Sequence, residues 1–256
     1  MISNNQIKFI KSLQTKKFRN EYGIFIAEGD KISKMILKSD YKVHSLYATN
    51  DWLNSNHEII IDINHEEVSI NELGRISSLK TPQEVLVVVK IADQKLNPKD
   101  LLNQLTLVFD EIKDPGNLGT VIRIADWFGI KNIICSLDSV DSYNPKVIQA
   151  TMGSFCNVKI HYYPLDDLFN INKKEMHLPV YGTLLNGENI YHANLKKEGL
   201  IVFGNESKGI DQNYYTFINE SIKIPSIDCV GSGAESLNIG VSVGIVCSEF
   251  MRYNFN

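Results

Sequence analysis

Residues 105–129, LTLVFDEIKDPGNLGTVIRIADWFG, decide the fold of this chain. The apolar run at 105–110 predicts a buried strand, and the Pro-Gly turn that follows leads into a helix over about 118–128. One helix face carries the apolar residues, which are Leu118, Val121, Ile122, Ala125 and Phe128. Arg123 lies about 140° around the helix from Leu118, so it is expected to point away from that face.

The rest of the second half repeats this alternation of strand and helix, which predicts a mostly parallel sheet. Asn144 followed by Pro145 indicates the start of another helix. The remaining elements are expected at 132–135, 157–161, 179–183, 200–204 and 222–225 as strands, and at about 235–252 as a long helix.

The first half reads as a smaller α/β unit, and a polar segment at 91–104 that contains Pro98 reads as a linker. We therefore expect one domain at 1–95 and a second at 104–256. In the first domain, helices are expected at 4–13 and 30–39, and strands at 24–27, 43–48, 58–62 and 85–89.

Composition excludes several classes of protein. The chain has 256 residues, 43% hydrophobic and 22% charged, which is typical of globular proteins. It has no apolar run of about 18 residues and no signal peptide, so we expect a cytoplasmic protein without a membrane anchor. Its scattered cysteines, Cys135, Cys156, Cys229 and Cys247, form neither a disulfide framework nor a zinc motif, and no metal site is expected.

Charge is distributed unevenly along the chain. The net charge is −4, yet residues 1–42 hold nine Lys and Arg against four acidic residues, and residues 43–75 hold six acids and one Arg. A basic segment in an acidic protein is not explained by overall composition; it fits a polyanionic partner, and the alternative is a solvated face of an amphipathic helix.

Two further segments place glycines and polar residues directly after a predicted strand, where open α/β sheets bind ligands. They are LIVFGNESKGI at 200–210 and IKIPSIDCVGSGAESLNIGVSVGIVCSEF at 222–250. Structural roles are also open: Asn117 fits a helix N-cap, Arg123 a solvated helix residue, and Glu235 and Ser236 a helix start. Gly240 and Gly244 lie on a small-residue face that suits either core packing or a dimer contact.

Taken in this order, the three segments resemble the signature motifs of the SpoU-type (TrmH-like) RNA ribose 2′-O-methyltransferases of the SPOUT superfamily. The first motif is matched by Asn117, Gly119 and Arg123, with Ala125 to Gly129 following. Gly204, Glu206 and Gly209 match the second. The third is matched by Ile224-Pro225 and Ser236-Leu237-Asn238, although the ten residues from Ser226 to Glu235 exceed the family's usual spacing. Residues 7–32 resemble the RNA-binding domain that often precedes this catalytic domain.

The resemblance implies a C-terminal SPOUT domain with a deep trefoil knot, a homodimer, and methyl transfer from S-adenosylmethionine to a ribose 2′-hydroxyl of RNA. It implies catalytic roles for Asn117, Arg123, Glu206, Ser236 and Asn238, and cofactor contacts for Gly204, Gly209, Ile224 and Leu237. Because an arginine is a poor base, we expect Arg123 to grip the RNA phosphate and to stabilise the developing alkoxide.

In the basic N-terminal segment, Lys16, Lys17 and Arg19 are expected to contact phosphates, with Phe18 available for stacking. Ribosomal RNA is the expected substrate, and transfer RNA the alternative; no DNA partner is expected. A non-catalytic RNA-binding protein that keeps the knotted fold is a second alternative. A nicotinamide-dependent oxidoreductase is disfavoured because the chain lacks a GxGxxG loop.

Overall fold

The computed structural model describes residues 2–93, 95–227 and 236–252, which divide into two compact units. The first unit comprises residues 1–93 and 141–156, and the second comprises 94–140 and 157–256. The change of unit at 93/94 lies within the predicted linker, whereas segment 141–156, from the middle of the predicted second domain, packs with the first unit.

The first unit contains a four-stranded mixed sheet of order β1-β4-β2-β3. A core of residues such as Ile10, Ile26 and Val88 fills one side of it. Its elements are α1 (Asn4–Ser12), α2 (Lys16–Tyr22), β1 (Ile24–Glu28), α3 (Asp30–Leu37), β2 (Val43–Ala48), α4 (Asn50–Ser55), η1 (His57–Ile59), β3 (His65–Glu67), α5 (Ile70–Ile76), β4 (Val85–Lys90), α7 (Pro145–Thr151) and η3 (Ser154–Cys156).

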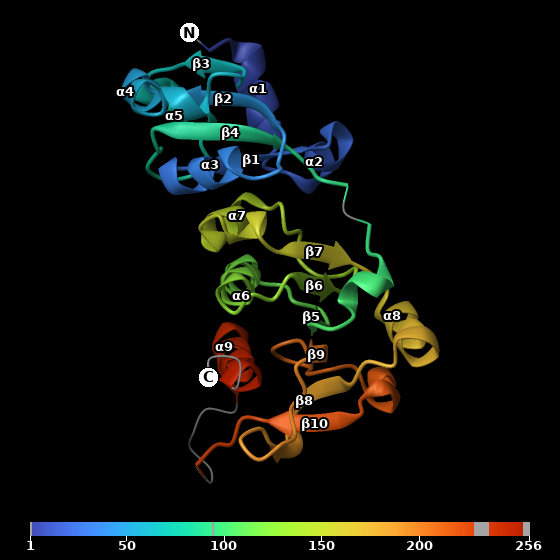
Figure 1. The fold of residues 1–256 in the computed structure, drawn as a ribbon. Helices are drawn as coiled ribbons and strands as arrows, with labels where there is room; N and C mark the ends of the chain where they lie inside the picture. Colours follow the sequence, from blue (N-terminus) through green and yellow to red (C-terminus); the bar gives the residue numbers. More distant parts are fainter. Residues whose placement is uncertain (1, 94, 228–235, 253–256) are drawn as a thin grey trace. The chain divides into compact units, whose positions relative to one another are not determined.

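The second unit contains a six-stranded sheet of order β10-β8-β9-β5-β6-β7, in which every neighbouring pair is parallel (Figure 1). Its elements are η2 (Pro98–Leu101), β5 (Leu105–Phe109), α6 (Pro115–Trp127), β6 (Asn132–Cys135), β7 (Lys159–Tyr162), α8 (Leu165–Ile171), η4 (Asn172–Met176), β8 (Val180–Asn189), β9 (Gly199–Phe203), η5 (Gln212–Phe217), β10 (Glu220–Lys223) and α9 (Ile239–Met251).

Helices cover both faces of this parallel sheet. Val108 and Val202 point to the face on which Leu168 of α8 packs. On the other side α6 and α9 lie next to each other, and Tyr181 meets Phe250 of α9 edge to face at 4.9 Å (Figure 1). Because both faces of the sheet are covered, the central strands β5 and β9 are buried at every position, as the apolar run at 105–110 predicted for β5.

The predicted α/β class and the parallel sheet are confirmed, and several details differ. The strand expected at 58–62 is wrong: a short helical turn occupies His57–Ile59, and the strand follows at His65–Glu67. The first motif's helix begins at Pro115, because Asp114 accepts a hydrogen bond from the backbone N–H of Asn117 and caps it. Asn117 is therefore not the N-cap.

The long C-terminal helix begins at Ile239, where Asn238 caps it by accepting from the Gly240 N–H. Glu235 lies outside the described residues, and Ser236 precedes the helix without capping it. The predicted start at Asn144-Pro145 is confirmed. Gly240 faces α6, since a Cβ there would lie 2.9 Å from Cγ2 of Thr120, so this glycine serves the packing of α9 on α6.

The described residues contain neither a membrane-spanning helix nor a cluster of metal-ligating side chains. No helix in this part of the chain is long and apolar enough to span a bilayer. The same residues hold no cluster of three His, Cys, Asp or Glu side chains with the spacing of metal ligands.

Candidate active site at the carboxyl ends of two parallel strands

Strands β5 and β9 are neighbours in the sheet, with Phe109 opposite Phe203, so the loops that follow them start at the same edge. The N–H of Asp110 donates to the carbonyl of Phe203 at 2.9 Å. The first and second motifs, which lie about 90 residues apart in the sequence, therefore begin side by side.

Side chains from all three motifs meet at this edge. Asn117 Nδ2 donates to Oε1 of Glu206 at 2.7 Å. Asn238 Nδ2 donates to Oδ1 of Asn117 at 3.0 Å. A carboxylate only accepts hydrogen bonds, so Glu206 fixes which end of each amide faces which neighbour. We call Asn117, Glu206 and Asn238 the amide–carboxylate trio.

The trio offers several groups to a substrate. Glu206 and Asn238 are exposed and Asn117 is half-buried; each amide nitrogen carries a second N–H, and the carboxylate has a second oxygen. Donors and an acceptor of this kind suit a sugar hydroxyl, which both donates and accepts. The hydrogen bonds run in one direction, from the Gly240 N–H through both amides to the carboxylate, and such chains strengthen one another.

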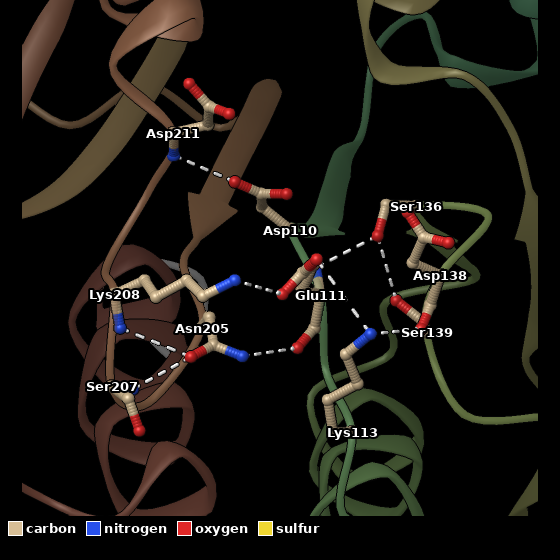
Figure 2. Close-up of polar contacts among 10 residues, drawn as sticks. All are labelled: Asp110, Glu111, Lys113, Ser136, Asp138, Ser139, Asn205, Ser207, Lys208 and Asp211. Atoms are coloured by element: carbon tan, nitrogen blue, oxygen red, sulfur yellow. Dashed lines mark hydrogen bonds and ion pairs between the residues drawn. The ribbon is translucent and has the colours of Figure 1, made fainter.

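A second set of contacts holds the loop that carries Glu206 (Figure 2). Asn205 Nδ2 donates to the carbonyl oxygen of Glu111 at 3.1 Å. Asn205 Oδ1 accepts from the backbone N–H groups of Ser207 and Lys208, and its backbone pairs with Gly209. Asn205 thus closes its own loop and ties it to the segment after β5, which leads into α6 and Asn117.

Glu111 has a left-handed backbone, with φ 60°, which is uncommon for a residue with a side chain. Its N–H donates to Ser136 Oγ at 2.9 Å, and its carboxylate lies 3.6 Å from Lys208 and 3.9 Å from Lys113 (Figure 2). Residues of the loops that follow β6 and β9 therefore hold this conformation. The sequence analysis assigned no role to Asn205 or Glu111. The signal that could have identified them is their position directly after a predicted strand.

Asp110 is the buried carboxyl at this edge. It is 8% exposed, and its Oδ2 accepts from the Asp211 N–H at 2.8 Å. Burial raises the pKa of Asp110, nearby Asp211 and Glu111 act in the same direction, and the hydrogen bond from Asp211 opposes them.

Two glycines shape the loop between β9 and η5. A Cβ on Gly204 would overlap the carbonyl carbon of Gly209, so no other residue fits at position 204 without moving the loop. Gly209 has φ +73° and open space around it. The predicted pair Gly204 and Gly209 is therefore brought together.

In the described part of the chain, no side-chain hydrogen bond or ion pair joins the other predicted site residues to the trio. Arg123 is exposed on α6, six residues after Asn117, as its position on the helix predicted. Ile224 follows β10 half-buried, and Ser236 and Leu237 are exposed just before Asn238. The segment 228–235 between them lies outside the described residues.

Of the three predicted RNA contacts, Lys16 and Lys17 are exposed on α2. Arg19 differs, because its side chain is only 2% exposed. Its Nη1 donates to the carbonyl of Leu13 at 2.8 Å, and its Nε donates to Asp141 at 3.1 Å. A buried, paired guanidinium does not face a phosphate, so Arg19 has a structural role in place of the predicted one.

Comparison with known proteins identifies the family to which this fold and site belong. Residues 104–248 match the model of the SpoU rRNA Methylase family, and residues 4–87 match the MRM3-like substrate binding domain. Since the first match covers more than half of the chain, the chain belongs to the SpoU rRNA Methylase family, and the resemblance drawn from the sequence is confirmed.

Individual relatives are similar over nearly their whole length. The 23S rRNA (guanosine(2553)-2′-O)-methyltransferase RlmP of Bacillus subtilis is 27% identical over 95% of this chain and 94% of its own. The structure of a TrmH-family protein from Porphyromonas gingivalis is 32% identical, with a TM-score of 0.88 over 99% of both chains. An AdoMet-bound rRNA methyltransferase from Sinorhizobium meliloti is 25% identical, with a TM-score of 0.87 over 99% of this chain and 96% of that one.

Proposed function

We propose that this protein transfers the methyl group of S-adenosylmethionine to a ribose 2′-hydroxyl of ribosomal RNA. The observation that carries the proposal is the meeting of Asn117, Glu206 and Asn238, from three separate motifs, in one hydrogen-bonded trio. The names of the relatives support the substrate, because RlmP and the Sinorhizobium meliloti enzyme are both rRNA methyltransferases.

S-adenosylmethionine supplies a methyl group on a positively charged sulfur, which makes that methyl electrophilic. The residues present fit such a cofactor. Leu237 exposes 48% of its side chain directly before Asn238, which provides apolar surface beside polar groups. Gly204, Gly209, Ile224 and Leu237 are the residues that we assign to cofactor binding. The AdoMet-bound relative from Sinorhizobium meliloti supports the choice of cofactor.

The protein's task is to align the ribose hydroxyl and to help it lose its proton as the methyl is transferred. Within the trio, the amides would donate to the ribose, and Glu206 would hold them in place. Ser236 is assigned to the same task because it stands two residues before Asn238.

Arg123 is assigned to the RNA phosphate next to the reacting ribose. Because a guanidinium is a poor base, Arg123 is assigned to stabilising the developing alkoxide and not to removing the proton. The proton would leave through a phosphate oxygen or water. Among the described residues, the Arg123 guanidinium has neither a hydrogen-bond partner nor an ion-pair partner, so it is available to bind a phosphate of the RNA.

Three further features belong to the proposal: a cytoplasmic homodimer, a knotted C-terminal domain and no DNA substrate. Trp127 on α6 is 84% exposed and Val241 on α9 is 51% exposed, which provides apolar surface on two packed helices. The packing of α9 on α6 supports the knot, since the end of the chain returns to the first motif's helix.

The test is transfer of labelled methyl from S-adenosylmethionine to unmodified ribosomal RNA and, separately, to transfer RNA. We expect label in ribosomal RNA alone. Label only in transfer RNA would overturn the substrate. No label in either, with S-adenosylmethionine still bound, would favour the non-catalytic RNA-binding alternative.

A further inference from the structure

Four aromatic rings of the first unit touch one another in a row. Phe18 and Tyr22 of α2 are stacked, with ring centroids 6.0 Å apart and planes at 12°. Phe9 of α1 lies 5.3 Å from Tyr22 and 6.2 Å from His44 of β2. We call Phe18, Tyr22, Phe9 and His44 the aromatic row.

The row lies at the surface. Tyr22, near its centre, is 46% exposed, His44 is exposed, and Phe9 and Phe18 are half-buried. Phe9 also packs against the hydrophobic core of the unit, which fixes one ring of the row to the core. Burying apolar surface is favourable, so aromatic rings that are exposed to water would be stabilised by a ligand that covers them. A row of such rings is therefore a candidate binding surface.

The buried Arg19 fixes the helix that presents two of these rings. Its hydrogen bond to the Leu13 carbonyl joins α2 to the turn before the helix, and its hydrogen bond to Asp141 joins α2 to the segment 141–156. Gly23, with φ 64°, then ends the helix directly after Tyr22. Rings held in this way lose little conformational entropy when a ligand stacks on them.

The segment that carries three of the four rings is basic, which favours an anionic ligand. Residues 8–22 include four exposed lysines, Lys8, Lys11, Lys16 and Lys17, and one exposed acid, Glu21. The Lys17 Nζ lies 5.6 Å from the ring centroid of Phe18, so a cation already borders the rings. Flat apolar faces flanked by lysines match a ligand of flat bases on a phosphate chain.

We propose that the aromatic row stacks unpaired bases of the RNA substrate while the neighbouring lysines contact its phosphates. The inference rests on the proposed function for the RNA substrate and adds which form of RNA is bound. The bases must be unpaired, because the faces of paired bases are covered by their stacked neighbours. The row thus directs the enzyme to a loop or bulge of the RNA and away from a continuous duplex.

The experiment measures affinity for a short single-stranded RNA of mixed sequence and for the duplex of the same sequence. Tyr22→Leu removes the ring but keeps apolar bulk, and Tyr22→Phe keeps the ring and removes only the hydroxyl. Tyr191→Leu is the matched control, since Tyr191 is also 46% exposed but lies outside the row.

We expect Tyr22→Leu to weaken single-strand binding about tenfold, with Tyr22→Phe and Tyr191→Leu close to the wild type. Duplex affinity and the salt dependence of single-strand binding should stay unchanged in Tyr22→Leu, because no charge is lost. Unchanged single-strand affinity in Tyr22→Leu would overturn the proposal, and so would an equal loss for single strand and duplex.

Methyl transfer separates this proposal from the proposed function. Tyr22→Leu should raise the KM for ribosomal RNA, with kcat and S-adenosylmethionine affinity unchanged. If the wild type methylates ribosomal RNA and Tyr22→Leu leaves both KM and affinity unchanged, only the aromatic row is refuted. If the wild type methylates no RNA, but Tyr22→Leu binds single-stranded RNA more weakly than the wild type does, the aromatic row stands and the proposed function fails.

Discussion

Asn117 Nδ2 lies 2.7 Å from Oε1 of Glu206, although the two residues are 89 positions apart in the sequence. This hydrogen bond joins the helix of the first motif to the loop of the second. Asn117→Asp replaces the donor by a second carboxylate and sets two like charges against each other. We expect kcat/KM for RNA to fall about a hundredfold, measured by methyl transfer.

The partner change provides the control for that prediction. In Asn117→Asp combined with Glu206→Gln, the new amide can donate to the new carboxylate, so part of the lost activity should return. Asn213→Asp makes the same chemical change at an exposed position outside the trio and should leave activity unchanged. A double variant no more active than Asn117→Asp would show that the pair is not coupled.

Arg123→Lys tests the role of the exposed guanidinium on α6. Lysine keeps the charge but loses the planar fork that binds a phosphate with two hydrogen bonds. We expect kcat at saturating RNA to fall about tenfold or more. Arg75→Lys, at an exposed position on α5, makes the same exchange and should be silent. Near-normal turnover in Arg123→Lys would remove this residue from the mechanism.

Gly204 and Gly209 are expected to respond differently to alanine. In Gly204→Ala the new Cβ would overlap the Gly209 backbone, so the loop must move, at a cost of about 3 kcal/mol in the free energy of unfolding. In Gly209→Ala there is open space, and only the left-handed backbone opposes the side chain, at about 1 kcal/mol. Chemical denaturation measures both; equal losses would contradict the predicted crowding at Gly204.

Asp110 gives the protein a pH dependence of stability. Its pKa is raised by burial, so the folded protein binds the proton more tightly than the unfolded chain. The contribution of Asp110 to the free energy of unfolding is therefore fully present below the pKa of this group in the unfolded chain. It is lost as the pH rises through the pKa in the folded protein. Asp110→Asn keeps an oxygen for the Asp211 N–H, so its unfolding temperature should gain on the wild type as pH rises above about 4. A constant difference across pH would contradict this.

Trp127 tests the proposed homodimer. An indole that is 84% exposed on α6 would lose contact area if a charge replaced it, so Trp127→Glu should shift the mass in sedimentation equilibrium from dimer to monomer. Leu185→Glu alters an equally exposed apolar residue on β8 and should leave the mass unchanged. A wild type that sediments as a monomer at all concentrations would refute the dimer.

The sequence predicted those parts of the fold that depend on local pattern. The strand at 105–110 and the direction of Arg123 follow from apolar periodicity, which reads burial directly. The strand expected at 58–62 failed because three isoleucines, Ile59 to Ile61, imitate a strand, whereas a short turn places Ile60 inside and leaves Ile61 76% exposed.

Contacts between distant residues were beyond local pattern. Arg19 looked like one more surface cation, because its partner Asp141 lies 122 positions away. The trio could be expected only from the family resemblance, which suggested its members without their hydrogen bonds. The link from Asn205 to Glu111 depends on the pairing of β5 with β9, which no single stretch of sequence specifies.

The most direct test of the central claim is the position of the transferred methyl group on RNA. After transfer of labelled methyl to unmodified ribosomal RNA, the product is hydrolysed in alkali, which requires a free 2′-hydroxyl to cut the chain. We predict that the label is recovered in an alkali-resistant dinucleotide, and that Asn117→Asp greatly reduces it. Label recovered in mononucleotides would place the methyl on a base and would contradict the account.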